Sequence, residues 1–345
     1  MATLDEILDN YSKKPSPEEQ DENTAKSFLA SFKEKIARNK PLKTGFKKLD
    51  AKLDGGLYQG LYVIGSISSL GKTSFCLQIA DQLAQQGELV LFVSLEMQKE
   101  ELIAKLISRI TFLTDAKLAK TTRQILNGQS KNYYTKEEKQ LIDSSIETFN
   151  KYANNIYILE GGRDWSGKEK GDIDEIEAFI NKIEETRHKK PVVIIDYLQI
   201  LAPYDATHQK GQITDKQRID KNIVELKRLS RDKELIIFCI SSFNRENYAE
   251  PVSLASFKES GAIEYTSDLL LALQLAGMDY SKSQKGTYES DTERLKRIRE
   301  LQAKAKESQS VELELKILKN RNGTITKSGE LVLSFYKAYN DFEEI

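Results

Sequence analysis

Residues 66–73 read Ser-Ile-Ser-Ser-Leu-Gly-Lys-Thr and stand between an apolar strand-like run and a helix-like run. This order is typical of a phosphate-binding loop, in which backbone N–H groups at a helix N-terminus wrap a phosphate. In such a loop Gly71 allows close approach, Lys72 neutralises the β- and γ-oxygens, and the Thr73 hydroxyl binds Mg²⁺. The pattern therefore predicts that the chain binds ATP with Mg²⁺. The residues expected to bind the nucleotide are Ser66, Ser68, Ser69, Leu70, Gly71, Lys72, Thr73 and Ser74.

The first position of this loop departs from the usual pattern. The eight-residue motif usually begins with glycine, whereas Ser66 stands there and Gly65 lies one place earlier. A chance match to the relaxed motif is the alternative. The strand expected before the loop and the helix expected after it both argue for a genuine phosphate loop.

Two acids follow buried strand-like runs and are candidates for catalysis and metal binding. Asp196 follows 192–195 and is expected to hold the metal through water, because carboxylates at the ends of parallel strands lie where ligands bind. Glu96 follows the strand-like run at 89–93 and is expected to orient and deprotonate the attacking water. The alternatives are a helix N-cap for Asp196 and an ordinary first-turn acid for Glu96. Glu100 is a rival base, but it falls one turn into the next helix.

From residue 42 onward, short apolar runs alternate with helical stretches, which predicts parallel strands joined by crossover helices. Strands are expected at 61–64, 89–93, 155–159, 192–195, 235–240 and 269–273. Helices are expected at 72–86, 98–110, 172–186 and 216–232, with more helix within 116–151. A closing antiparallel pair is expected at 311–318 and 331–336, and a charged, partly helical insertion at 279–309.

The N-terminal segment, residues 1–40, is expected to be separate from the main domain at 41–345. Most of 1–21 is polar and is expected to be flexible, whereas 22–38 carries an apolar stripe typical of a helix. Two interpretations stay open for this helix. It folds back on its own domain, or it is an arm that docks on a neighbouring subunit.

The composition excludes several classes of protein. Lys and Arg (52) nearly balance Asp and Glu (53), so nucleic-acid contact must be local. Cys76 and Cys239 lie in apolar runs and are expected in the core, and His188 and His208 are far apart, which disfavours a zinc site. The sequence shows neither a signal peptide nor a membrane-spanning run, so a cytoplasmic location is expected.

Several motifs, in order, resemble those of the C-terminal motor domain of DnaB-type replicative DNA helicases, within the RecA-like superfamily. The resemblance runs from about residue 44 to 342 and implies a RecA-like phosphate-loop ATPase core. It implies a mostly parallel twisted sheet flanked by helices, with a linker-type helix before it. Besides the phosphate loop, the motifs are Thr44-Gly45-Phe46-Lys47-Lys48-Leu49-Asp50, Ser94-Leu95-Glu96-Met97, Asp196-Tyr197-Leu198-Gln199, Ser242-Phe243-Asn244-Arg245, Lys258-Glu259-Ser260-Gly261-Ala262-Ile263-Glu264 and Lys319-Asn320-Arg321-Asn322-Gly323.

The resemblance implies roles for individual residues. Glu96 matches the catalytic carboxylate and Asp196 the metal-binding acid. Arg321, with Lys319, matches the finger that reaches the γ-phosphate of the adjacent subunit, and a basic residue in a surface turn is the alternative. The expected sensor residues are Gln199, Ser242 and Asn244. The expected DNA contacts are Lys258, Glu259 and Gly261 by family position, and Arg245 and Lys210 by charge alone.

Two departures from the family limit these expectations. Ser242 stands where the family usually carries Gln, so coupling between the γ-phosphate and the DNA loops is expected to differ. The family's N-terminal helical domain is not in the sequence, which suggests a stand-alone motor that assembles through 22–38. The leading hypothesis is an ATP-driven single-stranded DNA translocase and helicase, working in replication as a ring that is expected to be a hexamer. The alternatives are a RecA-like helicase loader or regulatory switch that does not unwind DNA, and a filament-forming recombinase.

Overall fold

The computed structural model describes residues 25–128, 133–163, 169–201, 214–243, 250–257, 261–279 and 289–345. The chain divides into two units, Met1–Leu42 and Lys43–Ile345. In the first unit, helix α2 spans Ala25–Arg38, in agreement with the helix expected at 22–38. Phe28, Phe32 and Ile36, which form the apolar stripe of this helix, are each about half exposed.

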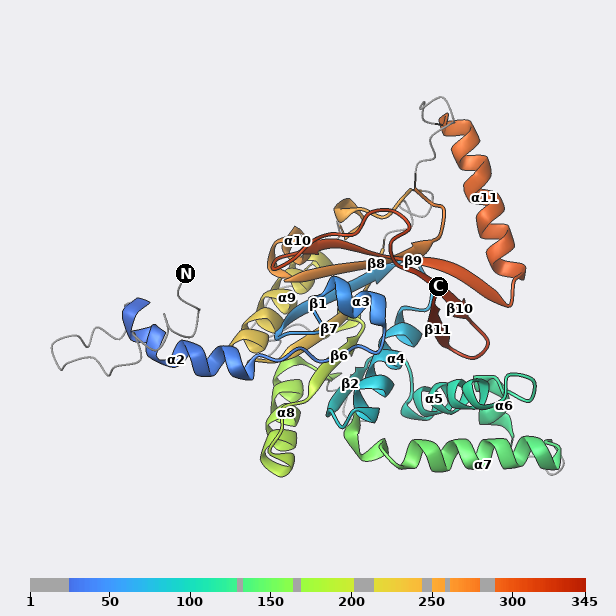
Figure 1. The fold of residues 1–345 in the computed structure, drawn as a ribbon, viewed down its shortest axis with the longest axis horizontal. Helices are drawn as coiled ribbons and strands as arrows, with labels where there is room; N and C mark the ends of the chain where they lie inside the picture. The colour runs from blue at the N-terminus through green and yellow to red at the C-terminus, as the bar shows by residue number, and fades with distance from the viewer. Residues whose placement is uncertain are drawn as a thin grey trace, which may run out of the picture. The chain divides into compact units, whose positions relative to one another are not determined.

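The described part of the second unit is built on a nine-stranded sheet with the order β11-β10-β9-β8-β1-β7-β6-β2-β3 (Figure 1). Six neighbouring strands, from β8 to β3, are parallel, and the last three strands are antiparallel. The predicted, mostly parallel sheet is therefore confirmed. The strands are β1 (Gly60–Ser66), β2 (Val90–Ser94), β3 (Ile156–Glu160), β6 (Val192–Asp196), β7 (Ile236–Ser242), β8 (Leu269–Leu275), β9 (Ser310–Asn320), β10 (Val332–Tyr336) and β11 (Asp341–Glu344). A separate hairpin pairs β4 (Gly162–Arg163) with β5 (Glu169–Lys170).

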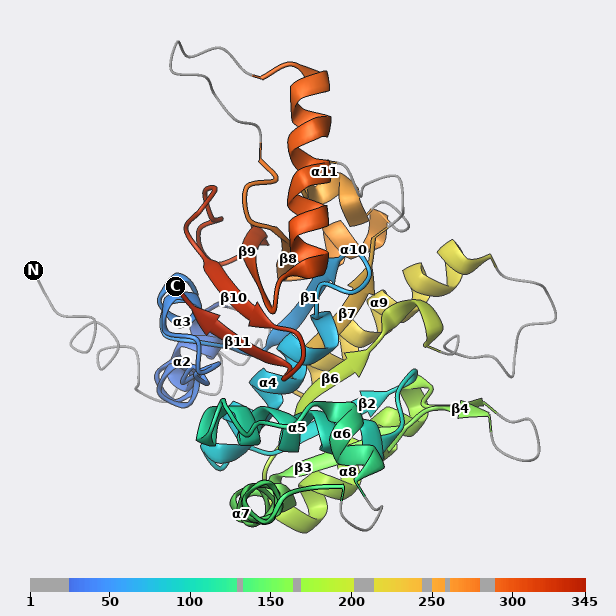
Figure 2. The same cartoon turned by 90° about the vertical axis from the view of Figure 1, so that its right-hand side faces the viewer.

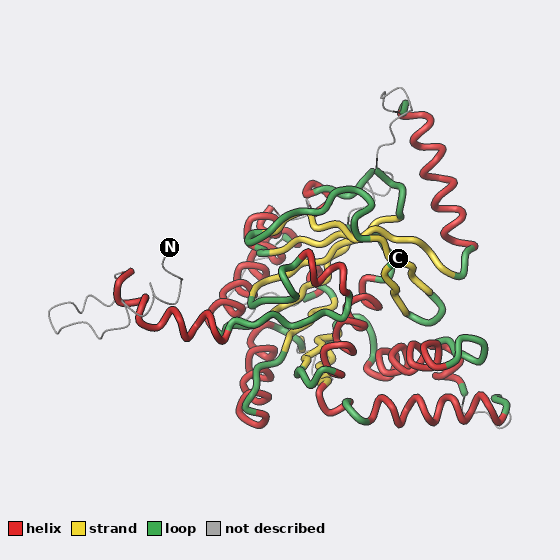
Figure 3. The backbone as a smooth tube through the Cα atoms, in the orientation of Figure 1, coloured by secondary structure: helices red, strands yellow, loops and turns green. Residues whose placement is uncertain are grey.

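Helices surround the strands of this unit, as Figure 3 shows. None of the helices in the described segments is long and apolar enough to span a membrane. The helices are α3 (Lys47–Lys52), α4 (Lys72–Gln85), α5 (Lys99–Thr114), α6 (Thr122–Asn127), α7 (Lys136–Asn150), α8 (Ile173–Arg187), α9 (Asp215–Asp232), α10 (Gly261–Thr266) and α11 (Asp291–Glu307).

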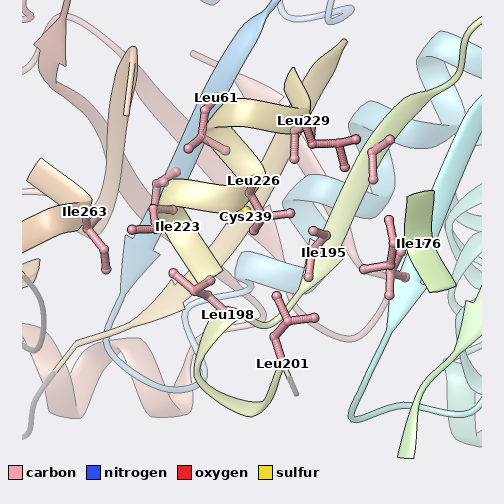
Figure 4. Close-up of a cluster of buried hydrophobic side chains, with 14 of the residues drawn as sticks. Leu61, Ile176, Ile195, Leu198, Leu201, Ile223, Leu226, Leu229, Cys239 and Ile263 are labelled. Atoms are coloured by element: carbon pink, nitrogen blue, oxygen red, sulfur yellow. The ribbon is translucent and has the colours of Figure 1, made fainter. Parts of the chain in front are cut away.

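The core lies on both faces of the parallel strands, which explains why those strands read as continuous apolar runs. On one face, α8, α9 and α10 pack against alternate residues of the strands. Figure 4 shows Ile223 and Leu226 of α9 near Leu61 of β1 and Cys239 of β7, and all four side chains are fully buried. On the other face α4 supplies buried Phe75, and Cys76 is buried as a free thiol like Cys239.

The further helix expected within 116–151 is present as two helices, α6 and α7. Thr121 and Thr135 each form a capping box at the start of α6 and α7, because each hydroxyl accepts the N–H three residues on. The charged segment 279–309 contains α11, which projects away from the sheet next to β8 and β9 (Figure 2). Its Arg294 and Ile298 are buried, so one side of this helix packs on the domain.

Candidate nucleotide-binding and catalytic site

The loop between β1 and α4 leaves the N-terminus of α4 open to a ligand. Ser69 and Gly71 adopt positive φ angles of 67° and 82°, a region that glycine enters without strain. A Cβ on Gly71 would lie 2.6 Å from the ring of Phe335, so no larger residue fits there. Gly71 also caps α4 without any side-chain hydrogen bond. The first N–H groups of the helix are therefore available to an anion.

The structure accounts for serine at the first position of the loop. Ser66 is fully buried, and Lys72 Nζ donates to its carbonyl oxygen at 3.0 Å and to its Oγ at 3.3 Å. The hydroxyl therefore helps to hold the lysine. Gly65 serves packing instead, because a Cβ there would lie 2.2 Å from the ring of Phe243. Burial lowers the pKa of Lys72 to about 8, against the opposing attraction of nearby Asp196 and Glu96.

A cavity of about 500 Å³ opens beside this loop, a size within the range of small-molecule sites. It brings together the predicted Lys72, Thr73, Glu96 and Asp196. Ser66 and Leu70 were also expected to bind the nucleotide, but neither lines the cavity. The other residues of the wall are Ser68, Ser69, Gly71, Ser74, Met97, Lys105, Tyr197, Ile240, Ser242, Phe335, Lys337 and Asn340.

The two acids come from neighbouring strands. Asp196 ends β6, which pairs with β2 in a register that sets Ser94 opposite Asp196. Glu96 follows β2 and is exposed at the cavity wall. The cap of α5 is Gln98, so Glu96 precedes that helix and is not a first-turn acid. Its rival, Glu100, lies in the first turn of α5 and does not line the cavity.

Asp196 has the surroundings expected of a carboxylate that binds a metal ion together with Thr73. Thr73 donates a hydrogen bond to it, and burial raises its pKa to about 6. Its Oδ2 is buried and has no hydrogen-bond partner in the described part of the chain. Hydroxyl and carboxylate oxygens are ligands that Mg²⁺ accepts, so Thr73 and Asp196 fit a magnesium ion. The N-cap alternative is wrong, because the turn that follows is capped by Tyr197.

Seven residues of the cavity wall were not expected from the sequence to belong to the site: Met97, Lys105, Tyr197, Ile240, Phe335, Lys337 and Asn340. Four of these lie outside the predicted motifs: Lys105 comes from α5, Phe335 from β10, and Lys337 and Asn340 from the turn between β10 and β11. Asn340 links the C-terminal turn to α4 and α5, because its Oδ1 accepts from Ser74 Oγ of α4 at 3.1 Å and from Lys105 Nζ of α5 at 2.7 Å. These four residues belong to no local motif. Their positions depend on how the turn between β10 and β11 packs beside α4.

Lys319 and Arg321 lie at the opposite end of the strands from this cavity. Arg321 N–H donates to the carbonyl of Asp268, and Asp268 N–H donates to the carbonyl of Leu61, near the start of β1. The phosphate loop leaves the other end of β1 at Ser66, roughly 17 Å further along the strand. The structure therefore does not bring these two basic residues into the cavity of their own subunit.

The amino-acid sequence matches a known protein family. The model of the DnaB-like helicase C terminal domain matches residues 41–344. This chain belongs to that family. The DnaB-like chain is 26% identical over 317 residues to the replicative DNA helicase DnaB of Helicobacter pylori, covering 88% of this chain and 59% of that protein. It is 25% identical over 303 residues to the replicative DNA helicase DnaC of Bacillus subtilis, covering 87% and 55%. It thus spans little more than half the length of these two relatives.

Solved structures support the same fold for the DnaB-like chain. It aligns with a solved ATPase domain with a TM-score of 0.71 and 22% identity, over 94% of this chain and all of that one. It aligns with a DnaB-like replicative helicase, described with its interactions with primase, with a TM-score of 0.66 and 20% identity, over 98% of this chain and 70% of that one. The RecA-like architecture expected from the sequence is therefore confirmed.

Two predicted sensor residues of the DnaB-like chain are linked to each other. Gln199 Nε2 donates to Ser241 Oγ at 2.8 Å, and Ser242 N–H donates to Gln199 Oε1 at 3.3 Å. Ser242 also lines the cavity. The side chain of Gln199 thus holds the end of β7 beside the cavity. The third expected sensor residue, Asn244, lies outside the described residues.

Most of the expected DNA contacts lie outside the part of the DnaB-like chain that the structure describes. They are Lys210, Arg245, Lys258 and Glu259. Gly261 is described, and it is exposed at the first position of α10.

Proposed function

We propose that this chain is an ATP-hydrolysing motor that translocates on single-stranded DNA, unwinds DNA in replication, and works as a homohexameric ring. One observation carries the proposal. The cavity with Lys72, Glu96 and Asp196 lies at one end of the strands, whereas Arg321 lies at the other end. A single subunit therefore lacks a finger for its own cavity, and a second copy of the chain can supply one. A closed ring completes every site in this way.

The residues of the cavity support phosphoryl transfer from ATP to water. Lys72 and the N–H groups of α4 bind the phosphates, and Thr73 and Asp196 hold Mg²⁺, which would offset phosphate charge. Glu96 orients the attacking water and accepts its proton. Arg321, with Lys319, neutralises charge that develops on the γ-phosphate in the neighbouring subunit. Catalysis therefore depends on assembly.

The DNA contacts of this proposal come from segments that follow two strands of the parallel sheet. Gly261 offers a backbone N–H at the start of α10, and Lys258, Glu259, Arg245 and Lys210 are the further contacts expected from the sequence. Free N–H groups and local positive charge are enough to bind phosphates. The names of the relatives, which are replicative DNA helicases, agree with this choice of ligand.

A mixing experiment tests the shared site. Lys72→Ala subunits have an intact finger and a defective phosphate loop, and Arg321→Ala subunits have the opposite defect. We expect each variant alone to have a strongly reduced but measurable ATPase activity, and the activity to return when the two are mixed. Mixing Lys72→Ala with Glu96→Gln is the control, because both defects then lie in the same cavity. Failure to recover in the first mixture contradicts a finger that acts between subunits.

A second candidate function is a RecA-like ATPase that acts as a helicase loader or regulatory switch without unwinding. The observation that favours it is Ser242, which lines the cavity at the sensor position where the resemblance leads us to expect Gln. Single-stranded DNA stimulation of the ATPase, followed by unwinding of a forked duplex, separates the two functions. Unwinding supports the helicase, and stimulation without unwinding supports the switch.

A further inference from the structure

Asp268 lies just before β8, between the candidate finger and the beginning of β1. Its Oδ1 lies 3.1 Å from Nη1 of Arg321. Its Oδ2 accepts from the N–H of Leu61 at 2.8 Å and from Nζ of Lys227 at 2.5 Å. The backbone repeats the link, because Arg321 N–H donates to the carbonyl of Asp268 at 2.9 Å. One residue therefore touches the finger through both its side chain and its main chain.

We propose that Asp268 is the positioning residue for Arg321, holding the guanidinium ready for the nucleotide of the neighbouring subunit. This inference rests on the proposed function, in which Arg321 acts between subunits. A guanidinium is planar and has five N–H donors, so a carboxylate that binds at one nitrogen leaves others for a phosphate. The Arg321 side chain is 50% exposed, whereas that of Asp268 is 15% exposed. The half-exposed side chain of Arg321 is therefore paired with a partly buried carboxylate.

The anchor is itself held by the domain. Lys227 belongs to α9 and Leu61 to β1, so the carboxylate keeps two donors whether or not Arg321 is present. Partial burial also reduces the screening that weakens ion pairs on an open surface. An arginine that is already oriented loses less rotamer freedom when it meets its phosphate. Asp268 can therefore raise the rate of the step that Arg321 assists without contacting the nucleotide.

Strand β9, which ends one residue before Arg321, is irregular where it pairs with β8. The register between β8 and β9 shifts at Leu318, since Leu271 pairs with Ile317 and Leu270 pairs with Lys319. Such a bulge re-aims the side chains that follow it. Lys319 then reaches the carbonyls of Ser267 and Tyr265 at 2.7 and 3.2 Å, at the end of α10. The two basic residues thus have separate anchors, and Asp268 acts on Arg321.

The substitution Asp268→Asn tests the inference, because asparagine keeps the size of the side chain and an oxygen for Leu61. We expect the kcat for ATP hydrolysis to fall about tenfold with KM unchanged, the loss typical of one charge-assisted hydrogen bond. Asp279→Asn is the matched control. Asp279 is partly buried and paired with Lys316 at 2.5 Å, but it contacts neither the finger nor β1. Its substitution should leave kcat unchanged.

Mixed assemblies separate positioning between subunits from a structural effect within one subunit. Asp268→Asn subunits diluted into excess Lys72→Ala subunits receive intact fingers from their neighbours. Their ATPase activity should therefore rise to that of wild-type subunits diluted in the same way. A defect that persists would place the effect in the subunit's own β1, through Leu61, and would overturn the inference. In an Arg321→Ala background, Asp268→Asn should cause no further loss of kcat, and an additive loss would also overturn it.

The outcomes also distinguish this inference from the function on which it rests. If Arg321→Ala keeps the wild-type kcat, the shared-site function fails. If Arg321→Ala is impaired but Asp268→Asn has the wild-type kcat, the positioning role alone fails. Thermal melting shows whether Asp268→Asn folds. If it does not, Asp268→Glu replaces it in the same assays, because it keeps the charge and moves the carboxylate away from its three donors.

Discussion

Gln78 on α4 makes two hydrogen bonds to the backbone of Phe342 on β11. Its Nε2 donates to the Phe342 carbonyl at 2.9 Å, and its Oε1 accepts from the Phe342 N–H at 2.8 Å. Gln78 is 2% exposed, and β11 is an edge strand of the sheet. The side chain therefore takes the place of a further strand and fastens the C-terminus to the helix of the phosphate loop.

Replacing Gln78 with Met should lower the free energy of unfolding by about 2–4 kcal/mol, because two buried backbone groups lose their partners. Methionine keeps the volume of the side chain, so the loss reports the hydrogen bonds. Chemical denaturation followed by circular dichroism measures it. Gln86→Met is the control, because Gln86 is exposed on the same helical segment and should change stability by less than about 0.5 kcal/mol. Equal effects of the two substitutions would contradict the role of Gln78.

Arg109 on α5 joins two buried carboxylates, those of Asp81 at 2.7 Å and Asp341 at 2.8 Å. Arg109→Met leaves both carboxylates without their cation and should cost about 3–5 kcal/mol of stability at neutral pH. Arg231→Met is the control, because that arginine is 71% exposed and its ion pair should contribute less than about 1 kcal/mol. A small effect of Arg109→Met would contradict the interpretation.

The same substitution should change how stability depends on pH. Burial raises the pKa of both Asp81 and Asp341 above the ordinary value, and the attraction of Arg109 opposes that rise. Without Arg109 both pKa values should rise further. The folded chain then binds more protons than the unfolded one, so stability falls as pH rises from the ordinary carboxyl pKa through the raised value. Arg109→Met should therefore lose less stability at about pH 5 than at about pH 7.5, measured by urea denaturation.

Glu96→Gln should lower the kcat for ATP hydrolysis by about 10²–10⁴-fold, because the amide cannot accept a proton from water. Nucleotide affinity should stay close to that of the wild type, since Lys72 and the start of α4 remain intact. Glu100→Gln is the matched control, four residues away and outside the cavity. A steady-state ATPase assay and a fluorescent-nucleotide titration measure the two quantities. Loss of activity in Glu100→Gln with retention in Glu96→Gln would reverse the assignment.

Lys105→Met should raise the Kd for ATP about tenfold, because the variant lacks an ammonium group in the cavity wall that would attract the phosphates of ATP. The structure motivates this prediction, since Asn340 holds the Lys105 ammonium group beside Ser74 at the start of α4. Lys99→Met, at the exposed start of the same helix, should leave the Kd unchanged. A fluorescent-nucleotide titration compares the two variants. An unchanged Kd for Lys105→Met would show that this lysine serves packing rather than nucleotide binding.

The sequence by itself determined the parallel core and the centre of the cavity. Lys72 and Thr73 begin a helix, Asp196 ends a strand and Glu96 follows a strand by two residues, and those elements have strong local patterns. In a parallel sheet the strand ends meet at one edge, so predicting the strands already predicts that these side chains converge. The Arg321 motif was also visible, because its residues are adjacent in the chain.

The tertiary structure decided what depends on contacts between distant segments. Strand β11 has the sequence Asp-Phe-Glu-Glu, which has no strand pattern, and it forms because β10 and Gln78 satisfy its backbone. Asn340 and Lys105 lie 235 residues apart and meet only when that strand is in place. The pairing of Asp268 with Arg321 depends on the register of β8 and β9 in the same way. Local preference fixes most of the helices and strands, whereas long-range pairing fixes the remaining edge strand and which side chains share a site.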